Sequence, residues 1–489
     1  MPKIVLLWTD IALFLLLVAV AFYAWRAYRS PNLRATWGRV AQDTPAMCAA
    51  VVLGAFVLIG VLDSLHYRPL LEAVKVEGAK GGTSARAYAP VTKSVLDALL
   101  EKPVAGREKT YSAPLAVRQF NKESVLVNGQ PVRDFPRLRF GGAHLKDPDA
   151  QWLGDVLRRG LTGLVGGALV AFVACLLVGA AISHVRGLTP RATWDAIAER
   201  RTPVPWRAMM ITFGVLCLLT GVAASLSTGY HVMGTDSTGN DVLVQTIKSF
   251  RTALIIGSLT TLATLPLALS LGIMAGYFKG WVDDLIQYVY TTLTSIPGVL
   301  LIAACVLMVQ VFIDNNPEMF ATGAERADLR LFLLCIILGV TGWAGLCRLL
   351  RAETLKLREL DYVQAARAFG VSNARIMIRH LLPNVMHIVL ITVVLEFSTL
   401  VLYEAVLSYL GVGVDPSMNS FGSMINLARL EMSRDPMIWW NLLSAFVFML
   451  ALVLSANLFA DAVREAFDPR ARAFRPSWAR KRVTRTVRP

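Results

Sequence analysis

Residues 350–383 read LRAETLKLRELDYVQAARAFGVSNARIMIRHLLP and separate two long apolar runs, at 331–349 and 384–410. An apolar helix of about 20 residues is long enough to cross the ~30 Å hydrocarbon core of a membrane. The stretch between the runs is charged but rich in helix-forming residues. We therefore expect two membrane spans joined by a structured element on one side of the membrane.

Within this stretch, the pattern predicts a short helix, a sharp turn and a second helix. Apolar residues recur at helical spacing over about 357–369. Gly370 is expected to end this first helix in the left-handed conformation that glycine accepts. Ser372 is expected to cap a second helix through Ile376, and Pro383 to bend or end it. Such an element can dock into a groove of a soluble partner or lie on the lipid surface, and the residues alone leave both interpretations open.

The rest of the chain repeats the apolar pattern. Of its 489 residues, 55% are hydrophobic and only 17% are charged, which is more apolar than an ordinary soluble protein. We expect an all-α polytopic bundle of nine membrane spans, at about 4–24, 47–63, 161–184, 208–228, 252–276, 285–313, 331–349, 384–410 and 438–460.

The distribution of charge predicts the orientation of the chain. The net charge is +15, and arginines concentrate in segments 25–46 and 185–207 and in the tail after 463. Cytoplasmic loops of membrane proteins are rich in Lys and Arg, so this charge indicates topology and not nucleic-acid binding. Nine spans fit the pattern only if the amino terminus is outside and the carboxyl terminus is cytoplasmic.

These patterns predict four parts of the chain. The region at about 64–160 is too long for a simple loop and is expected to form a small or partly ordered ectodomain of unknown role. The predicted parts are a membrane anchor with a cytoplasmic linker at 1–46, two extra spans flanking the ectodomain at 47–206, a core at 207–472 and a basic cytoplasmic tail at 473–489.

Two segments of the chain resemble each other. Residues 141–172 and 229–263 each place a histidine, an Asp-containing turn, a glycine and then Asp-Val-Leu before an apolar run. The shared triplets begin at Asp155 and Asp241. Repeated spans are common in transporters, but any amphipathic segment that enters a membrane has a similar pattern. A partial internal repeat of the core therefore remains one of two interpretations.

The run DYVQAARAFGVSNARIMIRHLLPN, residues 361–384, resembles the signature loop of permeases in ATP-binding-cassette importers. That signature is Glu-Ala-Ala, three residues, Gly, nine residues and Ile-x-Leu-Pro. Gln364 stands where Glu is usual and His380 where Ile is usual. The patterns Asp-Tyr-x-x-Ala-Ala-Arg and Arg-His-x-Leu-Pro within this run are similar to the peptide-transporter branch. The resemblance implies ATPase coupling by Asp361, Tyr362, Gln364, Ala365, Ala366, Arg367, Gly370, His380, Leu382 and Pro383.

Other segments extend this resemblance over about 205–472. GTDSTGNDVL (234–243) is similar to an extracytoplasmic segment of the second permease of dipeptide and oligopeptide importers, with Asn240 where Arg is usual. AGYFKGWVDD (275–284) resembles a turn between two core spans, and YEAVLSYLGVGV (403–414) and AVREAFDPR (462–470) resemble later core segments. The implied residues are Gly276, Tyr277, Gly280 and Asp283 in a second cytoplasmic turn, and Gly234, Thr235, Asp236, Gly239 and Asp241 in the periplasmic segment.

The resemblance implies a type I importer permease with a six-helix core in the bacterial inner membrane. Such a subunit forms half of a pathway for peptides or similar small solutes and is not an enzyme. Its implied partners are a second homologous permease in a heterodimer, two ATPase domains, an extracytoplasmic substrate-binding protein and the lipid membrane. The alternative function is a non-transporting scaffold or channel built from permease spans.

Other features complete the expectations. The sequence contains no Gly-x-x-x-x-Gly-Lys-Ser/Thr loop, so we expect no cofactor on this chain and ATP hydrolysis by partner subunits. Its scattered histidines have no metal-binding spacing. Glu404, inside an apolar run, is a candidate for the solute pathway or for a bond to a neighbouring helix. Asp10 is expected near a water-filled crevice, and Gly163 with Gly167 favours close helix contact.

Overall fold

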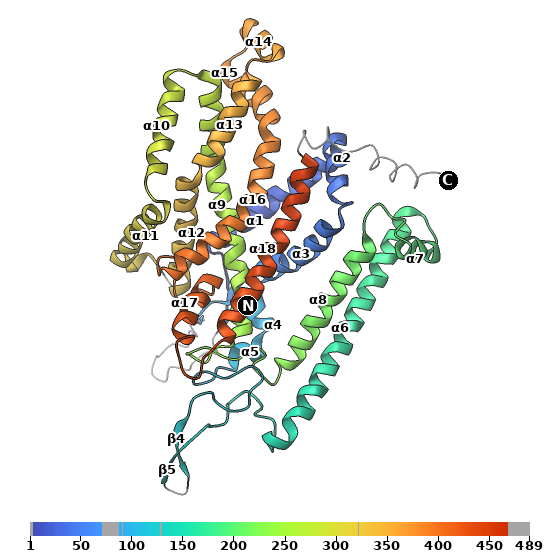
Figure 1. The fold of residues 1–489 in the computed structure, drawn as a ribbon, viewed down its shortest axis with the longest axis vertical. Coiled ribbons are helices and arrows are strands. Elements are labelled where there is room, and N and C mark those ends of the chain that lie inside the picture. The colour runs from blue at the N-terminus through green and yellow to red at the C-terminus, as the bar shows by residue number, and fades with distance from the viewer. Residues whose placement is uncertain (1–2, 71–87, 90, 128–129, 321, 468–489) are drawn as a thin grey trace, which may run out of the picture. The chain divides into compact units, whose positions relative to one another are not determined.

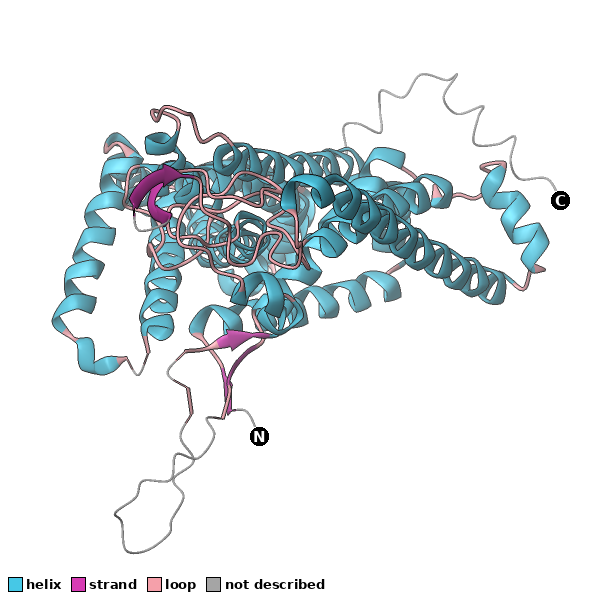
Figure 2. Ribbon diagram, turned by 90° about the horizontal axis from the view of Figure 1, so that it is seen from below, coloured by secondary structure: helices cyan, strands magenta, loops and turns pink. Residues whose placement is uncertain are grey.

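The computed structural model describes residues 3–70, 88–89, 91–127, 130–320 and 322–467 (Figure 1). In this part of the chain helices predominate, and the strands form two small sheets (Figure 2). The chain divides into two compact units. The first unit comprises Met1–Arg26, Asp63–Val95 and Arg251–Met418, and the second comprises Ala27–Leu62, Leu96–Phe250 and Asn419–Pro489. The predicted domain boundaries stay a prediction, and the predicted tail at 473–489 lies outside the described residues.

The first unit contains the coupling segment and most of the predicted core. Its small antiparallel sheet has the order β1-β2-β3, and its helices gather around the buried side chains of Tyr277, Trp343, Leu350 and Val385. Its elements are β1 (Lys3–Val5), α1 (Trp8–Arg29, which runs beyond the unit), β2 (His66–Arg68), β3 (Lys93–Ser94), α9 (Val242–Phe278, from residue 251), α10 (Trp281–Ser295), α11 (Gly298–Asn315), the 3₁₀ turn η1 (Pro317–Met319), α12 (Gly323–Gly342), α13 (Ala344–Leu357), α14 (Asp361–Ala368), α15 (Asn373–Ile376), the π turn η2 (Met377–Leu381) and α16 (Leu382–Tyr409).

The second unit contains the described part of the predicted ectodomain beyond residue 95. Its elements are α2 (Pro31–Val40), α3 (Thr44–Asp63), α4 (Val95–Leu99), α5 (Glu101–Ala105), β4 (Glu123–Val127), β5 (Gln130–Asp134), α6 (Pro148–Arg186), α7 (Pro190–Ala198), α8 (Trp206–Leu226), the first residues of α9, α17 (Phe421–Glu431) and α18 (Trp440–Phe467). Strands β4 and β5 form an antiparallel hairpin.

Helices α6 and α8 lie side by side along much of their length (Figure 1). A Cβ atom added at Gly163 would lie 2.5 Å from the carbonyl oxygen of Gly221, and one at Gly167 would overlap the carbonyl of Cys217. Side chains at these positions would separate the two backbones. The predicted close helix contact at Gly163 and Gly167 is therefore confirmed.

The membrane spans differ in detail from the nine that were predicted. Among the described residues, eight helices are long and apolar enough to cross a membrane, and the pair α12–α13, bent by 40°, would make a ninth. The predicted span at 285–313 is wrong, because the chain is extended at Ile296 and Pro297 and divides it into α10 and α11. Proline lacks an N–H group and disfavours helical geometry in the preceding residue.

A buried charge cluster joins α1, α9 and α12 within the first unit, and we call it the Arg251 cluster. Arg251 Nη2 lies 2.7 Å from Asp10 Oδ1 and 3.4 Å from Asp328 Oδ1, and His66 Nδ1 lies 2.8 Å from Asp10 Oδ2. Asp10 is fully buried. The expectation of a water-filled crevice at Asp10 is wrong, because the side chain is enclosed by its own ionic partners.

Each of the two similar segments contains the same kind of contact, between its histidine and its aspartate, within the second unit. His144 Nε2 lies 2.6 Å from Asp155 Oδ2, and His231 Nδ1 lies 2.7 Å from Asp241 Oδ2. Asp241 immediately precedes α9, whereas Asp155 lies two turns inside α6. The internal repeat stays a prediction.

Candidate functional site

The coupling segment is anchored to the first unit by one face of α14. Val363 is buried against a cluster that includes Leu350, Ile376 and Leu381, and Ala366 packs at its edge. The predicted first helix began too early, because α13 continues to Leu357 and a turn separates it from α14. The result is a two-turn helix with one face packed against the first unit and the other face exposed.

Gly370 ends this helix in the predicted left-handed conformation, with φ +74°. Its N–H donates to the carbonyl of Arg367 at 3.0 Å, and the N–H of Val371 donates to that of Ala366 at 3.1 Å. Among the described residues no atom lies within 4 Å of the place that a Cβ atom would take. Backbone conformation, and not crowding, therefore favours glycine here.

The second predicted helix is continuous with a membrane span. Ser372 is the N-cap residue of α15 as predicted, although among the described residues its side chain makes no capping hydrogen bond. α15 continues through the π turn η2 into α16. Pro383 lies in the first turn of α16, where its missing N–H is tolerated, and therefore does not end the helix.

The turn at 276–283, predicted to be a second cytoplasmic turn, contacts the coupling segment, although sequence reasoning treated the two as separate. Tyr277 donates its hydroxyl to Asn373 Oδ1 at 2.8 Å, and its carbonyl accepts from Arg358 Nη1 at 2.5 Å. Lys279 Nζ lies 3.0 Å from Glu359 Oε1. These three contacts fix the turn before α14 and the start of α15 to the end of α9.

The remaining residues predicted in that turn fix its backbone. Gly276 lies so close to α13 that a Cβ atom there would be 2.6 Å from Thr354 Cβ. Gly280 has φ +58°. Asp283 accepts two hydrogen bonds of 2.6 Å from Arg351, which lower the pKa of the Asp283 carboxyl. The turn is thus tied to α13 as well as to the turn before α14 and the start of α15.

Tyr362 and His380 set the angle between α14 and the following span. The amide Nδ2 of Asn384 donates to the Tyr362 hydroxyl at 3.0 Å and to the carbonyl of His380 at 2.7 Å. The rings of Tyr362 and His380 lie 6.1 Å apart. Two of the predicted coupling residues therefore meet across the Gly370 turn.

The free side of α14 carries most of the other predicted residues. Asp361, Gln364, Ala365 and Arg367 are exposed, and Pro383 is exposed while Leu382 is half-buried. A hollow of about 410 Å³ beside α14 is lined by Tyr277, Arg358, Glu359, Val363, Gln364, Arg367 and Ala368. Phe369, which sequence reasoning missed, is 87% exposed at the tip of the element.

Comparison with known proteins identifies the family. Residues 268–473 match the family described as binding-protein-dependent transport system inner membrane component. The oligopeptide transport system permease protein OppC of Haemophilus influenzae is 31% identical over 51% of this chain and 74% of its own length. OppC of Mycobacterium bovis is 32% identical over 50% of this chain and 78% of its own length. The chain is a member of this permease family.

The match confirms the main predictions from sequence. This permease is a multi-pass subunit of an ATP-binding-cassette importer, and such importers work with ATPase subunits and a substrate-binding protein. The all-helical polytopic fold is confirmed as well, and the family is one of transport proteins and not of enzymes. The glutathione transport system permease protein GsiD of Pectobacterium atrosepticum is 28% identical over 50% of this chain and 74% of its own length. The scaffold alternative gains no support from these relatives.

Gln364 of the permease has a local partner that explains its neutral side chain. Its Nε2 donates to the carbonyl of Glu359 at 3.2 Å and to Glu359 Oε2 at 3.4 Å. A glutamate at 364 would place a second carboxylate beside Glu359. The departure from the usual family residue thus fits the charge of the neighbouring turn.

The predicted extracytoplasmic segment of the permease, residues 234–243, is held by a network of hydrogen bonds in the second unit. Thr235 Oγ1 donates to the carbonyl of Thr110 at 2.9 Å, and Asp236 Oδ1 accepts from the N–H groups of Thr238 and Asn240 at 2.8 and 2.9 Å. Asp241 caps α9 by accepting from the N–H of Val244 at 3.1 Å.

Two glycines allow the predicted ectodomain to approach this segment closely. Gly234 has φ +73° and Gly239 has φ +78°, and Cβ atoms there would overlap the backbone carbonyls of Ser112 and Glu108. The predicted segment is thus packed directly on residues 108–112 of the predicted ectodomain.

The buried side chain of His231 links this segment to the predicted ectodomain through two carboxylates. His231 lies 2.7 Å from Asp241 and 3.5 Å from Glu108, and Glu108 also accepts from the N–H groups of residues 139–141. Burial opposes the charge of His231, but the two carboxylates outweigh it and raise the pKa of His231 to about 9. Burial likewise opposes the charge of Glu108, yet the nearby His231 and the hydrogen bonds from the backbone lower the pKa of Glu108 to about 2.

We expect the permease to lose stability at alkaline pH through His231. Because the pKa of His231 rises on folding, its contribution is complete below its unfolded pKa of about 6.5 and is lost as the pH rises through 9. The loss should be on the order of 3 kcal/mol. Thermal unfolding of the purified chain between pH 6 and 10 measures it. The control His231→Gln should lack this pH dependence, and parallel profiles for both proteins would contradict the prediction.

Gly370→Val is expected to abolish coupled transport without preventing insertion. Valine at φ +74° costs about 1–3 kcal/mol of local strain, enough to tilt α14 but not to unfold the chain. Uptake and ATPase co-purification are compared in membranes with equal amounts of protein. Gly370→Asn is the matched control, because asparagine tolerates this conformation. Wild-type uptake by Gly370→Val would remove the turn from the mechanism.

Glu404 is buried in α16 and accepts a hydrogen bond of 2.6 Å from Ser408 on the same helix. This contact satisfies one oxygen of its carboxylate within the first unit. The role of Glu404 in the solute pathway stays a prediction.

Proposed function

We propose that this permease forms half of the translocation pathway of an importer for peptides or similarly small solutes. The relatives named for oligopeptide and glutathione transport support this class of cargo. A second homologous permease completes the pathway as a heterodimer, and an extracytoplasmic binding protein delivers the solute. The carboxyl terminus lies in the cytoplasm and the amino terminus outside, in keeping with the basic segments 25–46 and 185–207.

Coupling to two ATPase domains takes place at α14. The observation that carries this proposal is the contrast between its two sides. Val363 and the clamp from Tyr277 hold one side, while the other presents Phe369 almost fully exposed. An exposed aromatic ring beside a hollow is a typical anchor of a protein interface. ATP is bound and hydrolysed by the partners, since this sequence lacks the usual phosphate-binding loop.

Phe369→Ala tests the docking role of α14. We expect it to weaken association with the ATPase by about 2 kcal/mol, or roughly thirtyfold, because Phe369 is the most exposed large apolar side chain at this element. Association is measured by co-purification across a dilution series, and transport by uptake of labelled peptides into cells that lack the native chain.

Tyr288→Ala is the matched control, since Tyr288 is also an exposed aromatic residue of the first unit, on α10. It should leave association and uptake unchanged. Equal ATPase recovery with Phe369→Ala and with the wild-type chain would contradict docking through Phe369. Intact docking with no peptide uptake by the wild-type chain would contradict the proposed cargo alone.

A further inference from the structure

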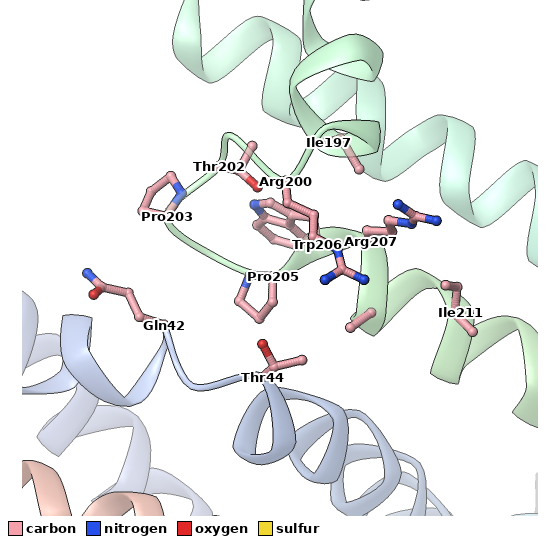
Figure 3. A pocket seen from close by; sticks show the side chains of 11 residues that line it. Gln42, Thr44, Ile197, Arg200, Thr202, Pro203, Pro205, Trp206, Arg207 and Ile211 are labelled. Atoms are coloured by element: carbon pink, nitrogen blue, oxygen red, sulfur yellow. The ribbon is translucent and has the colours of Figure 1, made fainter. Parts of the chain in front are cut away.

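A hollow of about 300 Å³ lies in the second unit, where α3 and α8 begin (Figure 3). The first residue of α3, Thr44, forms one wall. The end of α7 and the loop into α8 form the others, with the side chains of Arg200, Trp206 and Arg207. Its volume is at the lower end of the range for small-molecule sites. Its residues precede the family match at 268–473, so the family's coupling function does not account for it.

Arg200 occupies a position where glycine is usual. It follows α7 with φ +57°, and the N–H of Arg201 donates to the carbonyl of Ala196 at 2.9 Å, as in a glycine-terminated helix. A non-glycine residue is strained in this conformation. This conformation places the guanidinium of Arg200 at the hollow. No acidic side chain of the described residues forms an ion pair with it.

The other charges near the hollow leave it positive. Arg207 donates one hydrogen bond of 3.1 Å to the carbonyl of Ala198, which leaves its remaining N–H groups available. Glu199 is paired with Arg201, and Asp43 accepts from the N–H of Ala46. The amino-terminal end of α8 adds positive partial charge.

The hollow lies at the ends of two candidate membrane spans. Thr44 and Trp206 are the first residues of two helices that are long and apolar enough to cross a membrane. The ends of such helices meet the headgroup layer, where tryptophan is enriched. Basic pockets between membrane helices bind phosphate-bearing headgroups.

We propose that this hollow binds the phosphate of an anionic phospholipid, with Arg200 as the main contact and Arg207 as the second. A guanidinium matches the oxygens of a phosphate in a bidentate arrangement. Free inorganic phosphate has the same chemistry, but the position of the hollow at the ends of α3 and α8 favours the lipid. Bound lipid ties the start of α3 to the α7–α8 loop.

The test uses the full chain in detergent with Arg200→Gly, which removes the guanidinium and relieves the backbone strain. Bound lipid is counted by native mass spectrometry during titration with phosphatidylglycerol or phosphatidylcholine. We expect Arg200→Gly to weaken phosphatidylglycerol binding about five- to tenfold, with phosphatidylcholine binding unchanged. Arg191→Ala, which removes an exposed arginine of α7 outside the hollow, is the control and should bind like the wild-type chain.

Four outcomes would overturn the proposal. The first three are equal phosphatidylglycerol binding by Arg200→Gly and wild-type chains, equal retention of both lipids by the wild-type chain, and an equal loss with Arg191→Ala. A further arm adds inorganic phosphate at millimolar concentration to chain carrying phosphatidylglycerol. Continued retention supports the lipid, whereas Arg200-dependent displacement by free phosphate overturns the assignment to a lipid. Thermal midpoints of the variants verify that each remains folded.

Discussion

Replacing Arg251 with glutamine is expected to destabilise the first unit by about 3–5 kcal/mol. Arg251 faces Asp10 at 2.7 Å and Asp328 at 3.4 Å, and all three side chains are buried. Removal of the cation leaves two carboxylates close together and away from water. Among the described residues, His66, 2.8 Å from Asp10, would remain as an ionic partner.

Thermal unfolding of the purified chain in one detergent measures this effect. Arg326→Gln is the matched control, because Arg326 lies on α12 near Asp328 but forms an exposed pair with Asp314. Such a pair contributes about 0–1 kcal/mol. Adding Asp10→Asn to Arg251→Gln should recover part of the loss, since one buried charge then disappears. Similar melting of Arg251→Gln and Arg326→Gln would show that the cluster does not stabilise the fold.

Gly167→Leu is expected to separate α6 from α8 at a cost of about 3 kcal/mol. The new side chain would overlap the backbone carbonyl of Cys217, which cannot rotate away as a side chain can. The helices would have to part, and the neighbouring approach of Gly163 to Gly221 would be lost with them.

The adjacent Gly166→Leu provides a control of the same helix and the same gain in apolar volume. Among the described residues no atom lies within 4 Å of a Cβ atom added at Gly166. Protease protection of the 187–205 loop and thermal unfolding are measured for both variants. The prediction is wrong if the leucine at 166 is as damaging as that at 167.

Local features were predictable where one residue decides a backbone conformation. Gly370 could be assigned as a helix end because its neighbours read as helix and glycine alone adopts φ +74° without strain. Pro297 carried a comparable signal that was missed, since the surrounding apolar run suggested one span. The start of α14 could not be placed, because residues before and after the break at 358–360 are equally compatible with a helix.

Contacts between distant segments could not be predicted from local pattern. The apolar run at 4–24 predicted a span, but nothing near Asp10 indicates Arg251 as its partner. The pairing of His231 with Glu108 and the clamp from Tyr277 likewise depend on the tertiary fold. Phe369 was also missed, because an aromatic residue at a helix end is usually buried and only the structure shows its exposure.

The Arg251 cluster has a consequence for the order in which the protein is made. Asp10 and Arg251 are 241 residues apart in the chain. At a synthesis rate of about 5–20 residues per second, the first helix leaves the ribosome on the order of 10–50 seconds before its counter-ion. During that interval Asp10 lacks the guanidinium that faces it in the finished fold, although His66, 56 residues away in the chain, follows it sooner. Asp10 therefore bears on the biogenesis of the protein as well as on the stability of the finished fold.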